Sequence, residues 1–299
     1  MKVFVTGSSG YCGKEIVREL VSAGHEVRGL SRSEDGVAAV TKLGATGVLG
    51  DSNDLDLIKR EASAADAVIH LAFDHSFTDM VGACAKEQAV IDTVCGLYDS
   101  TSKIVIYTSA MGLGIGIADF DEDAEIPAGG NPRGGAEVLA TQWRKRGVRV
   151  VGIRLPVVHG GDMGKGNFWL TPVNADMTAG CVGIVNGGEN VYTDCNVRDV
   201  ARLYVLALEN PDASRILHAV AGATKYKDLA TASAAHLKLP IKHMTPDEAP
   251  GHYGWFANFI QVDAPGDAKK TFKRIGWAAR EKTLLQALKD GEPAYFQKV

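Results

Sequence analysis

Short apolar runs alternate with stretches of helical periodicity through the first half of the chain. Between residues 11 and 23, Cys12, Ile16 and Leu20 recur at the spacing of one helix face, which predicts an amphipathic helix. The apolar runs predict six strands, at residues 2–6, 26–30, 46–50, 67–73, 103–109 and 149–155. Strands that alternate with helices predict a parallel sheet covered on both faces, which binds ligands at the carboxyl ends of its strands.

The pattern changes after residue 155. Residues 157–169 are glycine-rich and irregular, whereas residues 197–209 again show helical periodicity and residues 218–222 form one more apolar run. We therefore expect a large α/β domain and a smaller, discontinuous C-terminal lobe. The large domain comprises residues 1–155, with 190–222 returning to it, and the lobe comprises residues 156–189 and 223–299.

Composition and charge narrow the class of protein. Hydrophobic residues make up 45% of the 299 residues, and the net charge of -4 gives no reason to expect nucleic acid as a partner. The five cysteines are scattered without a Cys-x-x-Cys pair, so we expect reduced thiols and no metal site. No apolar stretch approaches the ~20 residues of a membrane span, and "MKVFVTG" is typical of a strand and a turn. We expect a cytoplasmic monomer or homodimer that binds a small molecule and no membrane.

A glycine-rich loop joins the first predicted strand to the first predicted helix. In "VFVTGSSGYCGKEI", Gly7 permits a tight turn, Gly10 lets a pyrophosphate approach the backbone, and Gly13 lets the helix pack closely on the strand. The amino end of the helix then offers N–H groups to the phosphates. A mononucleotide P-loop is excluded because Ser8 and Glu15 occupy two of its required positions, and no G-x-S-x-G elbow is present. The loop predicts a dinucleotide site.

The end of the second predicted strand indicates which dinucleotide would bind. An NAD site usually has Asp or Glu here, whereas this chain has Ser31, Arg32 and Ser33. A cation and hydroxyl groups suit a ribose 2′-phosphate, so the sequence favours NADP over NAD. Asp51, followed by Ser52, ends the third strand and could accept a hydrogen bond from the adenine amino group.

With these motifs, the chain resembles the short-chain dehydrogenase/reductase superfamily, in the extended or atypical branch often labelled NAD-dependent epimerase/dehydratase. The resemblance runs along almost the whole chain and rests on "TGSSGYCG", "GLSRS", "VIHLAF", "IVIYTSA", "GVRVVGIRLPVVHG", "VRDVAR" and "IGW". It implies a Rossmann-like doubly wound sheet with a smaller substrate lobe. It also implies that the cofactor is contacted by Ser9, Tyr11, Cys12, Leu71, Ala72, Phe73, Thr108, Leu155, Pro156, Val157 and Val158.

The chain departs from this family at the catalytic positions. The family usually carries a tyrosine and, four residues later, a lysine. With Glu137 aligned to the acidic residue that often follows that lysine, the two positions hold Gly129 and Arg133, and residues 108–191 contain no tyrosine. The usual serine position holds Ala110, next to Ser109. Arg133 could still contact the nicotinamide ribose, but its pKa above ~12 makes it a poor proton donor.

Three side chains near predicted strand ends are candidates to replace the tyrosine as proton donor. They are Ser109, His75 and His159, and a histidine would titrate near neutral pH. His70 lies inside an apolar strand and is expected to be a core residue. Tyr253 is a further candidate from the lobe, where it is also expected to help wall an apolar substrate pocket with Trp255, Phe256 and Phe259.

Three functions remain open from the sequence. The first is an NADP(H)-dependent oxidoreductase that acts on a small, partly apolar carbonyl compound or alcohol. The second is a redox-neutral isomerase or lyase on the same fold. The third is a cofactor-binding sensor or scaffold without turnover, which the missing tyrosine and lysine would allow.

Overall fold

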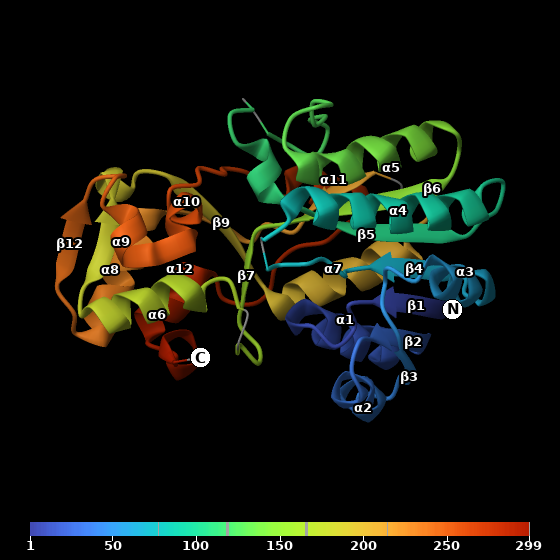
Figure 1. Cartoon of the computed structure of the whole chain (residues 1–299), viewed down its shortest axis with the longest axis horizontal. Coiled ribbons are helices and arrows are strands. Elements are labelled where there is room, and N and C mark those ends of the chain that lie inside the picture. The colour runs from blue at the N-terminus through green and yellow to red at the C-terminus, as the bar shows by residue number, and fades with distance from the viewer. Residues whose placement is uncertain (77, 118–119, 165–166, 214, 299) are drawn as a thin grey trace.

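The computed structural model describes residues 1–76, 78–117, 120–164, 167–213 and 215–298. Figure 1 shows a large sheet region that contains the N-terminus and a smaller lobe that contains the C-terminus, with β7 and β9 between them. The carboxyl ends of the large sheet's strands point toward the lobe, so the arrangement of the sheet decides which residues lie between the two regions.

The large sheet has seven strands in the order β10-β6-β5-β4-β1-β2-β3, and every pairing is parallel. The strand order reverses between β1 and β4, which is the point where such sheets bind ligands. This confirms the predicted doubly wound α/β fold. The strands are β1 (Lys2–Thr6), β2 (Glu26–Ser31), β3 (Thr46–Leu49), β4 (Ala67–His70), β5 (Ile104–Ala110), β6 (Arg149–Leu155) and β10 (Ile216–His218).

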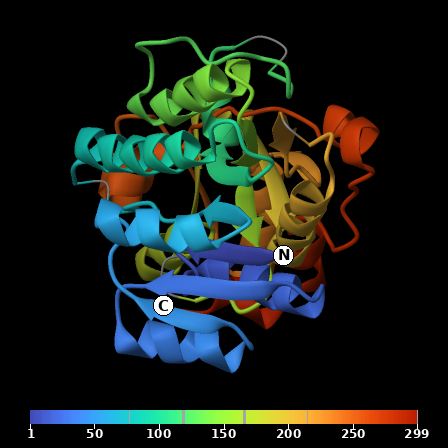
Figure 2. The same cartoon turned by 90° about the vertical axis from the view of Figure 1, so that its right-hand side faces the viewer.

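Helices cover both faces of this sheet, as Figures 1 and 2 show. Each face of the sheet has its own hydrophobic core. Successive side chains of β1 enter different cores, because Val3 and Val5 point to one face and Phe4 points to the other. The first side is covered by α1 (Tyr11–Ser22), α2 (Glu34–Lys42) and α7 (Val197–Glu209). The second side is covered by α3 (Leu55–Ala64), α4 (Met80–Tyr98) and α5 (Gly135–Lys145).

The lobe has a core of its own around two small sheets, ordered β11-β9-β7 and β12-β8. The strands are β7 (Val157–His159), β8 (Val182–Val185), β9 (Val191–Asn196), β11 (Gly222–Lys225) and β12 (Ile241–Met244). The helices are α6 (Leu170–Ala179), α8 (Tyr226–Leu237), α9 (Ala249–Tyr253), α10 (Ala257–Ile260) and α12 (Leu284–Asp290). One late segment returns to the large region: α11 (Lys269–Ile275) lies beside β10, and Trp277 is buried in the core beneath the sheet.

Three element boundaries differ from the expectations. The run at 67–73 forms a strand only to His70, because the backbone amides of Leu71 and Ala72 turn to hydrogen-bond the carbonyl and hydroxyl oxygens of Thr6. The run at 218–222 is divided between β10 and β11, which lie in different sheets. The helix expected near Asn131 begins with one 3₁₀ turn, η2 (Pro132–Gly134), before α5. No helix in these described ranges is both long and apolar enough to traverse a bilayer.

Candidate functional site

The glycine loop has the close backbone packing that its spacing predicts. Gly7 has φ +68°, and a Cβ on it would lie 2.8 Å from the backbone nitrogen of Ala72. A Cβ on Gly13 would lie 2.1 Å from the carbonyl oxygen of Gly7, so α1 can pack this closely only on glycine. Gly10 is the N-cap of α1 and contributes no side-chain cap. The amino end of α1 therefore presents N–H groups at the crevice, where a phosphate can accept hydrogen bonds.

The ends of β2 and β3 lie beside this loop. The hydroxyl oxygens of Ser9 and Ser31 are 2.9 Å apart, which joins the glycine loop to the end of β2. Arg32 is exposed, and Ser33 caps α2 by accepting a hydrogen bond from the Gly36 amide at 3.1 Å. Asp51 accepts one from the Asn53 amide at 2.8 Å, beside a partly exposed Ser52. These residues form a polar rim next to the glycine loop.

Tyr11 and Cys12 begin α1 and face the lobe side of the crevice. The Tyr11 hydroxyl donates to the carbonyl oxygen of Gly160, just past β7, at 2.5 Å. Both side chains pack against the core beneath the sheet, with Leu155 and Val158. Burial raises the pKa of the Cys12 thiol to about 12, so this thiol is protonated at neutral pH. Pro156 is half-buried between β6 and β7.

A buried polar cluster closes the floor of the crevice where β1, β4 and β5 end. His70 Nδ1 lies 2.6 Å from the Thr6 hydroxyl, and the Thr108 hydroxyl donates to the His70 carbonyl at 3.2 Å. Thr108 also shares a 2.7 Å hydrogen bond with the hydroxyl of Tyr204 on α7. Burial first, and the Arg133 charge second, lower the pKa of His70 to about 3, so the ring is neutral at pH 7. His70 Nε2 is buried and has no hydrogen-bond partner among the described residues.

Arg133 lies over this floor. Its guanidinium carbon is 3.4 Å from the centroid of the Phe73 ring, which follows β4, and its Nη2 is 3.2 Å from Glu87 Oε1 on α4. Burial lowers the pKa of Arg133, and the Glu87 carboxylate partly opposes this. Gly129, the other position expected to have lost its catalytic residue, lies in an exposed loop.

Glu87 is a buried acid that the sequence analysis did not single out. It is 4% exposed, and burial raises the pKa of its carboxyl group to about 7 although Arg133 acts in the opposite direction. A signal for it exists in the sequence. The buried stripe of α4 runs through Ala83, Cys84, Val90, Ile91 and Val94, and Glu87 is the charged residue within it. A charge at a helix position that faces a core needs a partner or a function.

The three proposed proton donors fall in different places. The His75 residue is exposed, and its Nδ1 lies 3.2 Å from the Phe73 carbonyl oxygen. Desolvation of the ring lowers the pKa of His75, and the Arg133 charge lowers it further. The Ser109 hydroxyl instead donates to Glu137 Oε2 at 3.0 Å on the α5 side of the sheet. His159 is fully buried, with Nδ1 2.8 Å from the Tyr295 hydroxyl and Nε2 3.1 Å from Asp194. These contacts occupy Ser109 and His159, so we do not propose either as the donor.

The four lobe residues expected to wall a substrate pocket differ in their burial and contacts. The Tyr253 hydroxyl lies within hydrogen-bonding distance of Asp176 Oδ1, at 3.0 Å, and of the Gly183 carbonyl oxygen, at 2.8 Å, in the core of the lobe. Trp255, Phe256 and Phe259 form an aromatic cluster with Phe168 from the glycine-rich loop. Trp255 is 57% exposed, so the cluster has a solvent-accessible apolar face. Tyr253 is therefore a core residue, and Phe256 is also buried, at 1% exposure, so Trp255 and Phe259 remain the candidates for substrate contact.

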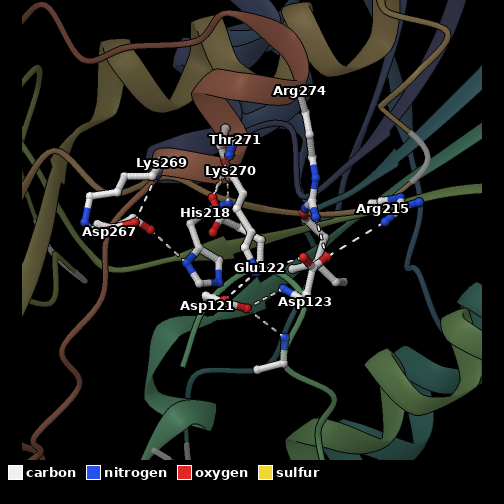
Figure 3. Close-up of polar contacts among 12 residues, drawn as sticks. Asp121, Glu122, Asp123, Arg215, His218, Asp267, Lys269, Lys270, Thr271 and Arg274 are labelled. Atoms are coloured by element: carbon white, nitrogen blue, oxygen red, sulfur yellow. Dashed lines mark hydrogen bonds and ion pairs between the residues drawn. The ribbon is translucent and has the colours of Figure 1, made fainter. Parts of the chain in front are cut away.

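An ionic cluster around Asp121, Glu122 and Asp123 fastens the loop that follows β5 (Figure 3). The backbone amide and hydroxyl of Thr271 donate to the buried Glu122 carboxylate at 2.6 and 2.8 Å. Lys270 pairs with Asp121 and Asp123 on either side. The buried Arg154 donates to the Asp121 and Ala124 carbonyls and pairs with Glu137. The start of α5 is thereby held against the sheet.

Within the described residues, no group of three or more His, Cys, Asp or Glu side chains is arranged to bind a metal ion. The uncapped end of α1, the glycine loop and the polar rim at β2 suit a phosphate-bearing nucleotide instead. The fold and this loop define a Rossmann-like α/β protein with a glycine-rich loop at the ends of its strands.

Comparison with known proteins identifies the family. The NAD dependent epimerase/dehydratase family matches residues 3–86. An uncharacterized protein of Schizosaccharomyces pombe is 35% identical over 99% of this chain and all of its own length. The sterol-4-alpha-carboxylate 3-dehydrogenase, decarboxylating, of Dictyostelium discoideum is 26% identical over 74% of this chain and 71% of its own. The dTDP-glucose 4,6-dehydratase DesIV of Streptomyces venezuelae, solved with NAD and TYD, superposes with a TM-score of 0.78 at 18% identity, over 99% of this chain and 97% of its own. The chain belongs to the NAD-dependent epimerase/dehydratase family.

Proposed function

We propose that this protein is an NADP(H)-dependent oxidoreductase that interconverts a carbonyl group and an alcohol on a small, partly apolar substrate. The observation that carries the proposal is the glycine loop, in which a Cβ at Gly13 would lie 2.1 Å from the Gly7 carbonyl while the end of α1 has no side-chain cap. Such a loop places N–H groups against a pyrophosphate. The Dictyostelium relative, named as a dehydrogenase, supports the redox assignment.

The residues at the strand ends support binding of this cofactor. The end of α1 would hold the pyrophosphate, and Arg32 with Ser31 would hold a ribose 2′-phosphate. Asp51 would receive the adenine amino group, while Thr108 and Phe73 would flank the nicotinamide half. When bound, NADPH supplies a hydride to a carbonyl carbon. The protein orients the substrate and stabilises the charge that develops on its oxygen.

The aromatic cluster of Phe168, Trp255, Phe256 and Phe259 supports an apolar substrate. Phe168 and Phe256 have ring centroids 4.7 Å apart, and Trp255 packs edge-on against Phe256 and Phe259. Ligand sites are mostly apolar with few polar groups, and an exposed aromatic face on the lobe meets this condition. We propose that this face covers the part of the substrate that does not react.

Cofactor choice is tested by titrating NADPH and NADH into the wild type and into Arg32→Ala. Loss of a charge-assisted contact to the 2′-phosphate costs about 1.5–3 kcal/mol, which corresponds to at least about tenfold in affinity. We expect Arg32→Ala to lower NADPH affinity by this factor and to leave NADH affinity unchanged. Arg60→Ala, at an exposed arginine on α3, is the matched control. Equal wild-type affinities for the two cofactors would reject the preference for NADP.

Turnover separates this proposal from its two rivals. The wild type is incubated with NADPH and with acetophenone, benzaldehyde or cyclohexanone, and NADPH loss and alcohol formation are both measured. Stoichiometric formation of alcohol supports the oxidoreductase. Family membership keeps a redox-neutral reaction as second candidate, and product formation without net loss of cofactor would favour it. Cofactor binding without any conversion would favour a sensor.

A further inference from the structure

The ion pair between Arg133 and Glu87 is incompletely hydrogen-bonded. It joins Arg133 Nη2 to Glu87 Oε1 at 3.2 Å. The other guanidinium nitrogen, Nη1, and the other carboxylate oxygen, Oε2, are both buried, and neither has a hydrogen-bond partner among the described residues. Buried polar groups in folded proteins are almost always satisfied, so an unused donor and an unused acceptor on one pair indicate a missing ligand.

A comparable pair elsewhere in the chain shows the contrast. Glu61 on α3 is also buried, at 6% exposure, and accepts a hydrogen bond from Arg28 Nε at 2.7 Å. Its other oxygen lies 3.4 Å from Arg60, so both oxygens have a cationic neighbour. Glu87 has one cationic neighbour and a free oxygen, although it is the more buried of the two acids.

The pair lies close to the end of β4. Arg133 stacks on Phe73, just past β4, and its charge influences the pKa values of groups on several neighbouring elements. These groups are His70 at the end of β4, His75 in the segment after it, Cys84 on α4 and Tyr204 on α7. His70 contributes a third buried atom without a partner, Nε2. The pair therefore lies over the ends of β1, β4 and β5, where the nicotinamide half of a dinucleotide is expected.

We propose that Arg133 and Glu87 together form the acid–base site of this protein, with one substrate oxygen bound between Arg133 Nη1 and Glu87 Oε2. A hydroxyl group can accept a hydrogen bond from Nη1 and donate one to Oε2, so a single alcohol oxygen satisfies both atoms. The inference rests on the proposed oxidoreductase function. It assigns Arg133 the stabilisation of the oxygen and Glu87 the proton, and it needs no tyrosine.

The reduction balances with these two residues. As the carbonyl carbon of the substrate accepts the hydride, the electrons of the C=O π bond move to oxygen, which Arg133 Nη1 stabilises as it becomes negative. The protonated Glu87 carboxyl then gives its proton to that oxygen, so its O–H bond breaks and the O–H bond of the alcohol forms. The substrate is reduced by two electrons, the nicotinamide is oxidised by two, and Glu87 is left as a carboxylate paired with Arg133. A proton from solvent restores it.

The direction of the Glu87 pKa agrees with this role. Burial raises it from 4.5 to about 7, so the acid is half-protonated near neutral pH. Reduction needs the protonated form, so its rate should fall about tenfold per pH unit once the pH exceeds about 7. Oxidation of the alcohol needs the carboxylate and should rise over the same range.

The first test compares Glu87→Gln, Glu87→Asp and the control Glu61→Gln in single-turnover reduction of the carbonyl probes between pH 6 and 9. We expect Glu87→Gln to slow hydride transfer by about 10²-fold or more, to remove the decline with pH, and to leave NADPH affinity unchanged. Glu87→Asp should restore a declining profile, and Glu61→Gln should keep the wild-type profile. A Glu87→Gln variant that retains both the rate and the profile of the wild type would overturn the proposal.

The second test needs no turnover. Infrared spectra of the wild type and of Glu87→Gln are compared as the pH is raised, without cofactor. A carboxylic C=O band that is lost near pH 7 in the wild type and is missing from Glu87→Gln supports the proposal. If this band is absent, the proposal fails even if NADPH reduces a ketone. If the band is present but no carbonyl probe is reduced, the acid is real and the oxidoreductase function fails.

Discussion

Replacing Gly10 by alanine should weaken cofactor binding without harming the fold. Gly10 has φ −71° and ψ 174°, a conformation that any L-residue adopts. The added Cβ would meet one atom closely, the carbonyl oxygen of Gly7 at 3.2 Å. Alanine is a poorer N-cap than glycine, so we expect the change to cost about 1 kcal/mol or less in unfolding free energy. For a chain of this length that lowers the Tm by about 2 °C or less.

Binding should respond much more strongly than stability. The Cβ would stand at the uncapped end of α1, where the proposed pyrophosphate approaches the N–H groups. Loss of one charge-assisted hydrogen bond costs about 1.5–3 kcal/mol, and each 1.4 kcal/mol is a factor of ten. We therefore expect the Kd for NADPH to rise about 10–100-fold in Gly10→Ala.

Two other glycines serve as matched controls. At Gly13 the Cβ would lie 2.1 Å from the Gly7 carbonyl and 2.8 Å from the Ser8 carbonyl, so Gly13→Ala must move backbone and should lose both stability and binding. At Gly24, beyond the other end of α1, φ is +83° and no atom lies within 4 Å, so Gly24→Ala should lose some stability and keep binding. The assays are thermal unfolding and NADPH fluorescence titration. Unchanged NADPH affinity in Gly10→Ala would refute the reasoning and leave the loop as a turn.

Three further outcomes follow from buried polar groups. Arg154→Leu should cost about 3–5 kcal/mol in urea unfolding, because it leaves the buried Glu137 unpaired; a smaller loss than Lys270→Ala would contradict this. Thr271→Val should cost about 1–3 kcal/mol by removing a donor to Glu122, whereas Lys270→Ala, at a partly exposed pair, should cost at most about 1 kcal/mol. The pKa of His70 is lowered from 6.5 to about 3, so the unfolded chain binds more protons in this range and stability falls as the pH falls. His70→Gln should flatten that decline, and an unaltered stability curve would argue against a neutral buried ring.

The fold was predictable because its signals are local. A buried parallel strand requires a short apolar run, and each run in the first half became a strand of the large sheet. The strand at 67–73 was overestimated because its last three residues are also apolar, although they turn toward the glycine loop. The return of Trp277 to the core of the large region could not be seen, since an apolar residue does not reveal which of two cores it enters.

The site was predictable only where its residues are neighbours in sequence. The three glycines act within one turn, so their spacing alone predicts their packing. The contacts of Ser109 depend on which face of the sheet its side chain points to. Neighbouring strand residues point to opposite faces, so Thr108 bonds to Tyr204 on α7 and Ser109 bonds to Glu137 on α5. Glu87 and Arg133 come from different elements, and only the packing of η2 on α4 brings them together.

The missing tyrosine and lysine need not leave the protein without a proton near neutral pH. In the tyrosine–lysine arrangement, a cation lowers the high pKa of a phenol toward neutrality. The pKa of Glu87 has to change in the opposite direction, because a free carboxyl group has a pKa near 4.5, which lies below neutral pH and must be raised. Burial raises it and Arg133 opposes the rise, and the net value of about 7 shows that burial is the larger effect. A phenol held by a lysine and a buried acid restrained by an arginine thus reach the same pH range from opposite directions.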